Sequence, residues 1–178
     1  MLISEQKKKE NIIEYIIYMF QIQDILRAYN FDIEKIYDIY INRYNTSEAQ
    51  KEIIKKWYEN LISQMKAEKI EQKGNLSFLN SLMSELNTLH LAMLSDQNNL
   101  KHIDLAAWAK PNIEEFKKLS KSDSENDVEI CINALYSLFL LRLQKKEICE
   151  NTMMAMQTFS NLLANIALVY KMLETQKG

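Results

Sequence analysis

Glycine and proline, the residues that most readily interrupt a helix, are nearly absent from this chain. Its 178 residues include only two glycines, Gly74 and Gly178, and one proline, Pro111. A β-rich fold normally needs more of both residues at its tight turns. Hydrophobic residues make up 47% of the chain and charged residues 26%, which is enough apolar material for the core of one domain. The sequence therefore predicts an all-α, single-domain protein over residues 1–178.

Apolar residues repeat at helical spacing in several segments that are separated by short polar connections. Helices are expected at residues 5–29, 32–44, 47–73, 76–94, 111–120, 127–146 and 151–173. Gly74 suits the end of the third helix, and Pro111 suits the first position of the fifth. A turn near Asp96 and a short helical segment are expected between residues 94 and 111. Because the connections are short, we expect an antiparallel bundle of about six to seven helices.

The charge distribution disfavours nucleic-acid binding. The formal net charge is −2, and lysines are interleaved with glutamates, as in the segment KKWYENLISQMKAEKIEQK. No face is therefore expected to collect enough positive charge to neutralise a phosphate backbone. We expect no nucleic-acid partner.

The cysteines and the N-terminus favour a cytoplasmic protein. If one helix carried Cys131 and Cys149, they would lie roughly 27 Å apart, far beyond disulfide reach. Free thiols are typical of a reducing compartment. The charges at the N-terminus are followed by Glu10 and Glu14, without the small-residue cleavage site of a signal peptide.

Motifs for catalysis or metal binding are missing from the sequence. It contains no Gly-rich phosphate loop, no nucleophile elbow and no Cys-x-x-Cys pair. His90 falls among apolar residues, where a packed, hydrogen-bonded histidine is expected, and His102 falls in a polar, weakly structured segment. The two histidines lack the spacing of a metal motif. We therefore expect no catalytic residue, no metal and no cofactor, and the sequence leans away from an enzyme.

One arginine stands in an apolar segment, ALYSLFLLRLQKKEI, at residues 134–148. On a helical wheel Arg142 lies beside Leu138, Cys131 and Leu135, so it is expected to point toward the core. An unpaired buried guanidinium is costly and needs an anion or a path to water. Three interpretations stay open: a side chain that reaches solvent at the helix end, a structural ion pair, or a functional anion-binding group.

The expected partner of Arg142 lies in the first helix. Asp24 and Arg27 are three residues apart on one face of that helix, at a surface that should be packed, so they form either an intrahelical or interhelical salt bridge or a polar pocket with Arg142. Asp24 is the expected partner of Arg142, and Glu14 is the alternative. The candidate ligand-binding residues are therefore Arg142, Asp24, Arg27 and Glu14, and the ligand would be a small anion. Seven tyrosines within the first sixty residues could line such a pocket, or could lie at the rim of the core.

The segment NTMMAMQTFSNLLANIALVY, residues 151–170, contains no charged residue. Its scattered amides and hydroxyls argue against a membrane span. One helical face carries the core residues, and the other carries Met154, Asn161, Asn165 and Leu168. A second face without charge is rarely fully solvated. We therefore expect a homodimer or another protein partner, bound through this face or through the outer apolar arc of the first helix.

Two segments carry a resemblance to a known family. KKENIIEYIIYMFQIQDILRAYNFD, residues 8–32, and ALYSLFLLRLQKKEI resemble an uncharacterised all-helical bacterial family of unknown function. The resemblance implies a helical fold and no assigned activity. The expected function is therefore that of a non-enzymatic cytoplasmic protein that acts through protein–protein contacts. The alternative is a helical bundle that binds a small ligand or anion at a buried Arg/Asp site.

Overall fold

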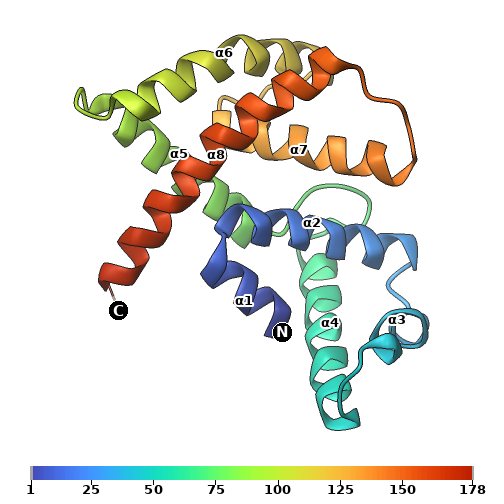
Figure 1. Ribbon diagram of the computed structural model, residues 1–178. Helices are drawn as coiled ribbons and strands as arrows, with labels where there is room; N and C mark the ends of the chain where they lie inside the picture. The colour runs from blue at the N-terminus through green and yellow to red at the C-terminus, as the bar shows by residue number, and fades with distance from the viewer. Residues whose placement is uncertain (1, 178) are drawn as a thin grey trace.

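The computed structural model describes residues 2–177, which are mostly helical and include no strand. The predicted all-α class is confirmed. Within this range there are eight α-helices, rather than six to seven, and one 3-10 helix (Figure 1). In order they are α1 (Leu2–Glu10), α2 (Ile12–Ala28), α3 (Ile33–Ile39), the 3-10 helix η1 (Ile41–Arg43), α4 (Glu48–Ala67), α5 (Ser77–Ser95), α6 (Leu100–Ser120), α7 (Asp127–Leu143) and α8 (Glu150–Lys177).

The predicted first helix is divided into α1 and α2 at Asn11. The backbone of Asn11 is extended, and its side chain accepts hydrogen bonds from the amides of Ile13 and Glu14 at 3.0 and 3.3 Å. The Asn11 amide group also donates to the Glu14 carboxylate at 3.4 Å. Asn11 is therefore the N-cap residue of α2, which begins a new helix. The extra helix therefore follows from a local signal, an asparagine followed three residues later by a glutamate.

α4 ends earlier than the predicted stop at Gly74. Its last helical residue is Ala67, and Lys69 adopts a left-handed conformation with φ +57°. The amide of Ile70 then donates to the Met65 carbonyl at 3.0 Å, which closes the helix end. Residues 68–76 consequently form a loop that returns the chain to α5.

α6 is continuous through Pro111, so the predicted break at this proline is wrong. Proline removes one backbone donor and normally kinks a helix. Here both halves of α6 are bonded to α8. His102 lies 3.0 Å from Asn165, and Asn112 donates to the Thr158 hydroxyl at 3.1 Å. These contacts favour one helix along α8 despite the local cost of the proline.

α8 is the central helix of the fold. It contacts α2, α5, α6 and α7, and in Figure 1 it crosses the group formed by α5, α6 and α7. Its buried face holds Met156, Phe159, Leu162, Leu163, Ile166 and Ala167. The buried apolar residues from α2 to α8 form one contiguous cluster. The arrangement is not a simple antiparallel bundle, because α4 projects away from α2 rather than lying along the other helices.

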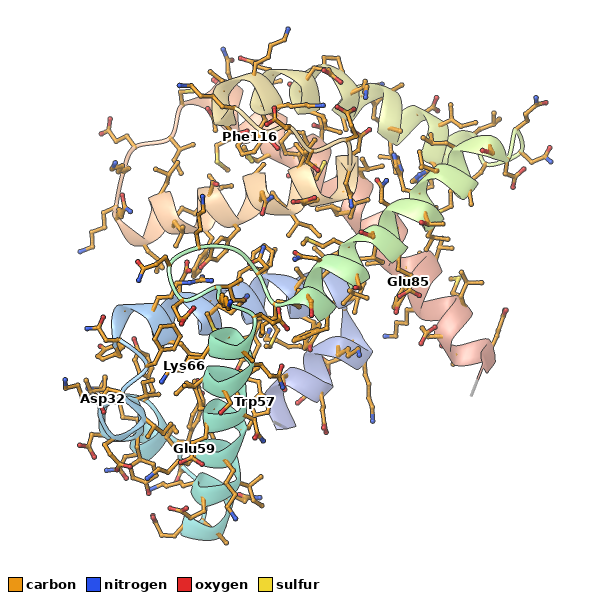
Figure 2. The ribbon with its side chains drawn as sticks, turned by 180° about the vertical axis from the view of Figure 1, so that it is seen from behind. Asp32, Trp57, Glu59, Lys66, Glu85 and Phe116 are labelled. Carbon is orange, nitrogen blue, oxygen red and sulfur yellow. The ribbon has the colours of Figure 1, made fainter. Side chains whose placement is uncertain are left out.

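α3 and α4 form a smaller lobe below α2. Figure 2 shows Trp57, Glu59 and Lys66 on α4, with Asp32 at the start of α3 beside it. Of the seven tyrosines in the first sixty residues, Tyr58 is buried and the other six are half-buried. Six of the seven tyrosines therefore lie at the rim of the core, one of the two positions that the sequence left open, and Tyr58 lies in the core itself.

No helix within residues 2–177 combines the length and the apolar character that crossing a membrane requires.

Candidate functional site

Asp24 and Arg27 form the ion pair that their spacing on α2 predicts. The Arg27 guanidinium donates to the Asp24 carboxylate at 3.0 Å. On the other side of this carboxylate, the Tyr136 hydroxyl of α7 donates at 2.6 Å. Burial raises the pKa of the Tyr136 hydroxyl, and its hydrogen bond to Asp24 raises that pKa further. The carboxylate of Asp24 therefore links α2 to α7.

Arg27 also holds the loop between α4 and α5. Its guanidinium donates to the carbonyl of Ile70 at 3.1 Å and to the carbonyl of Gly74. One turn earlier, the side-chain carbonyl of Gln23 accepts from the amide of Leu76 at 2.9 Å. Gly74 has φ +97°, a conformation that residues with a side chain rarely adopt. We call Gln23, Asp24 and Arg27 the loop clamp, because their polar groups hold this loop against α2.

The four residues predicted to share a site do not converge. Arg142 is exposed, and its guanidinium donates to the Met153 sulfur at 3.5 Å, so the predicted burial and pairing with Asp24 are wrong. As the helical wheel predicts, Arg142 lies on the face of α7 that holds Leu138 and Cys131. The last turn of α7, which carries Arg142, extends beyond the part of the helix in which this face is buried. Glu14 lies in the first turn of α2, where it pairs with Lys7 at 3.6 Å.

A group of polar side chains lies in the core. The sequence predicted that His90 is buried and hydrogen-bonded, but it did not predict the partners of His90. His90 on α5, His102 on α6 and Asn165 on α8 are at most 9% exposed. The Asn165 amide nitrogen lies 3.0 Å from His102 Nδ1, and His102 Nε2 lies 2.9 Å from His90 Nδ1. We call these three residues the histidine chain, because their bonds connect three helices.

The donors in the histidine chain follow from its chemistry. An amide nitrogen only donates, so His102 Nδ1 accepts and its proton lies on Nε2. That proton is then donated to His90 Nδ1. Burial, and next to it the neighbouring His102, lowers the pKa of His90 to about 4, and burial also lowers the pKa of His102. Both rings are therefore neutral near pH 7, where the chain acts as a hydrogen-bonded link.

His102 was expected in a polar, weakly structured segment, and that expectation is wrong. The residue is fully buried within α6. A signal was present in the sequence: the two histidines lie at similar distances on either side of the turn predicted near Asp96. Two consecutive helices that fold back at such a turn bring equally distant positions together. The bonding partner Asn165 follows only from the tertiary packing of α8.

Part of the uncharged surface of α8 remains exposed. Asn165 is covered by α6, but Met154 is 65% exposed and Leu168 is 48% exposed. The exposed residues between and including them lie on one face of α8. We call this set the α8 stripe; it consists of Met154, Gln157, Asn161, Ala164 and Leu168.

Trp108 is an exposed aromatic residue of α6, which packs against α8. Its side chain is 65% exposed, and it lies one turn before Asn112, which is bonded to Thr158 of α8. Residues four apart lie on the same face of a helix. The exposed indole is therefore on the side of α6 that borders the stripe, and the two together form an uncharged surface.

Chemically reactive groups are sparse within the described residues. No three side chains of His, Cys, Asp or Glu among them are grouped so that they could hold a metal ion. Cys131 is buried, which raises the pKa of its thiol, whereas Cys149 is exposed at the start of α8. A hydrogen bond with the Thr152 hydroxyl at 3.1 Å lowers the pKa of the Cys149 thiol. No histidine or carboxylate base is bonded to it.

Comparisons with known proteins identify the family of this chain but name no function for it. No curated protein and no solved structure matches the chain. One protein family matches residues 1–177, which is nearly the whole sequence. The chain belongs to the family described as Domain of unknown function (DUF4924).

Proposed function

We propose that this protein acts without catalysis, through protein–protein contacts, and that its first partner is a second copy of the same chain. The observation that carries the proposal is the α8 stripe, an exposed helical face without charge. Residues 151–170 include no charged side chain, so pairing two such faces buries no charge. No large apolar residue of α2 is comparably exposed. The stripe is therefore favoured over the first helix as the interface.

The spacing of the stripe suits a symmetric pair of helices. Met154, Asn161 and Leu168 are separated by seven residues each, which is two helical turns along one face. If two copies of α8 cross antiparallel at Asn161, Met154 of each copy meets Leu168 of the other. The two Asn161 amides then face each other and can exchange hydrogen bonds. Such self-complementarity is what a two-fold interface requires.

Trp108 supplies an aromatic anchor at the edge of this interface. Aromatic residues at the centre or border of a buried patch commonly contribute most of the binding energy. A stable interface buries about 800 Å² on each partner, with a core poor in charge. The stripe together with Trp108 offers a surface of that character.

The alternative, a bundle that binds a small anion at a buried Arg/Asp site, is supported less well. Asp24 already accepts from Arg27 and Tyr136, and Arg27 also bonds loop carbonyls. Arg142 and Glu14 are exposed elsewhere. We also propose the bacterial cytoplasm as the compartment; the resemblance to a bacterial family and the two unpaired cysteines support it.

Light scattering coupled to size exclusion tests the dimer. At tens of micromolar we expect a dimer, and Leu168→Glu should give a monomer with unchanged helical circular dichroism, because a buried unpaired charge is costly. Ile53→Glu is the matched control, since Ile53 is 50% exposed on α4, away from the stripe, and should leave the dimer intact. A monomeric native protein, or a dimeric Leu168→Glu variant, would contradict the proposal.

Crosslinking tests the antiparallel register separately. In a Cys149→Ser background, Asn161→Cys should form an intermolecular disulfide on mild oxidation, because position 161 lies on the two-fold axis. Met154→Cys should not, since its neighbour in the other copy is Leu168. Efficient crosslinking of Met154→Cys would instead indicate a parallel pair.

A further inference from the structure

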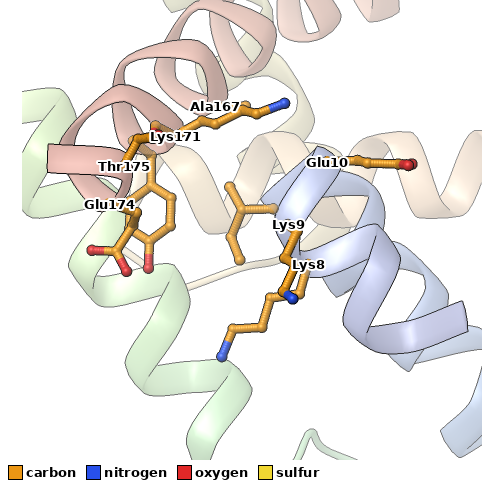
Figure 3. Close-up of a pocket in the computed structure, with 9 residues that line it drawn as sticks. Lys8, Lys9, Glu10, Ala167, Lys171, Glu174 and Thr175 are labelled. Atoms are coloured by element: carbon orange, nitrogen blue, oxygen red, sulfur yellow. The ribbon is translucent and has the colours of Figure 1, made fainter. Parts of the chain in front are cut away.

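A groove separates the C-terminal half of α8 from the junction of α1 and α2. It encloses about 430 Å³, within the range of roughly 300–1,000 Å³ that small-molecule sites occupy. Figure 3 shows Lys8 and Lys9 on one wall and Lys171, Glu174 and Thr175 on the other. The groove is distinct from the α8 stripe and from both internal polar clusters.

The groove carries a small excess of positive charge. Its lining includes three lysines, Lys8, Lys9 and Lys171, and two glutamates, Glu10 and Glu174, so the balance is +3 − 2 = +1. No carboxylate of a described side chain lies within 4.0 Å of these three ammonium groups. An ammonium group without a carboxylate partner attracts an anion that binds beside it.

Glu10 does not neutralise the lysines of its own wall. Glu10 accepts a hydrogen bond from Gln6 of its own helix at 2.8 Å, and Figure 3 shows its carboxylate pointing away from α8. The Lys8 ammonium lies 5.8 Å from the centre of the Tyr15 ring, a contact that leaves its charge uncompensated. The groove therefore keeps positive charge on the wall formed by α1.

The floor of the groove is apolar. It includes Ile12, which is 2% exposed, Ala167, and the half-buried ring of Tyr170. An inorganic anion would leave this floor uncovered, and a purely apolar ligand would leave the ammonium groups without a partner. A ligand that matches the whole groove needs one negative charge and an apolar body.

We infer that the groove between α1 and α8 binds a monoanionic carboxylate that carries a short apolar body. The carboxylate lies on the α1 wall beside the ammonium groups of Lys8 and Lys9, and the apolar body covers Ile12, Ala167 and Tyr170. Two sources offer this chemistry: a free short-chain carboxylic acid, or the C-terminal carboxylate of a peptide that ends in an apolar residue. Both have the same charge and differ in what extends out of the groove.

Titration followed by ¹⁵N-resolved NMR tests the inference with matched probes. Octanoate should bind saturably and shift the amides of Lys9, Tyr170 and Thr175. Its uncharged analogue octanamide should bind at least about tenfold more weakly, because it lacks the charge that the lysines recognise. A hexapeptide that ends in Leu-Leu, with a free carboxylate or an amidated end, forms the second arm. Whichever carboxylate binds tighter, octanoate or peptide, identifies the source.

Variants locate the site. Lys8→Gln/Lys9→Gln should weaken octanoate binding by at least about tenfold, whereas Lys56→Gln/Lys101→Gln, with two exposed lysines elsewhere, should not. Thr175→Trp should block binding by filling the groove without changing its charge. Circular dichroism confirms that each variant is folded. The inference is wrong if neither carboxylate binds at millimolar concentration, if octanamide equals octanoate, or if the shifted amides lie outside the groove.

Discussion

The loop clamp and the histidine chain both hold helices and loops together with polar side chains, but they differ in charge and in depth. The clamp uses a charged pair at a partly exposed place: the side chains of Arg27 and Asp24 are 18% and 45% exposed. The histidine chain lies in the core, where His102 is fully buried, and it contains no charged group near pH 7. Water therefore still reaches the clamp but not the chain.

This difference follows from the cost of removing charge from water. An ion in the core loses most of its solvation, whereas neutral imidazole and amide groups lose less and recover it through hydrogen bonds. Each His102 nitrogen has a partner in the chain. The clamp instead satisfies a permanent cation with backbone carbonyls of a loop. We expect the chain to determine global stability and the clamp to determine mainly the order of the loop.

The largest predicted effect is that of removing the middle of the histidine chain. His102→Leu leaves His90 and Asn165 without partners in a dry core and should reduce the free energy of unfolding by about 3 kcal/mol. Urea denaturation followed by circular dichroism measures this loss.

A triple variant gives the control for this prediction. In His90→Leu/His102→Leu/Asn165→Leu every polar partner is removed together, so no buried group stays unpaired. Much of the stability should return, because an apolar core of similar shape replaces the chain. If the triple variant is less stable than the single one, packing rather than hydrogen bonding explains the loss.

Lowering the pH should also weaken the histidine chain, because protonation of His90 is linked to unfolding. The pKa of His90 is about 4 in the folded protein and about 6.5 in the unfolded chain. Between these values the unfolded state binds more protons, so stability is complete above about pH 6.5 and falls as the pH is lowered toward 4. From about pH 7 to about pH 5, His90 alone should cost about 2 kcal/mol.

The charged groups that act on His90 oppose each other. The negative charge of Asp127 raises its pKa, while Lys110 and His102 lower it. A His90→Gln/His102→Gln variant should lose less stability than the native protein over the same pH range. Equal losses in the two proteins would show that carboxylates elsewhere, not the histidines, respond to the acid.

Helical periodicity predicts toward which face of a helix a side chain points. For that reason it predicted most of this fold. The helices near residues 76–94 and 127–146 are confirmed. The Asp24–Arg27 salt bridge and the tyrosines at the rim of the core are among the alternatives that the sequence left open. How deeply a side chain is buried is a different quantity, because it depends on how far the neighbouring helices extend. Arg142 has the wheel position of a core residue but lies past the end of the packed region. His102 has polar sequence neighbours but lies under α8.

Interactions between two helices that lie far apart in the sequence could not be predicted from the sequence either. Pro111 predicts a break, and the bonds of α6 to α8 on both sides of it favour a continuous helix. Asn165 was expected on a face that other helices or a second copy of the chain would cover, but its bond to His102 was not predicted. The loop carbonyls that Arg27 binds carry no sequence signal, since every residue has a backbone carbonyl.

The smallest predicted effects come from the arginines, which offer a matched comparison within one residue type. Arg27→Met keeps the apolar stem but removes the bonds to Asp24, Ile70 and Gly74, so unfolding should become easier by about 2 kcal/mol. The amides of residues 70–76 should then exchange faster with deuterium than those of α8. Arg142→Met should change stability by no more than about 0.5 kcal/mol, because the exposed guanidinium contacts only the Met153 sulfur among the described side chains. If the two variants cost the same, or if Arg27→Met leaves the loop as protected as before, the clamp does not hold the loop and the contrast between a charged clamp and a neutral chain fails.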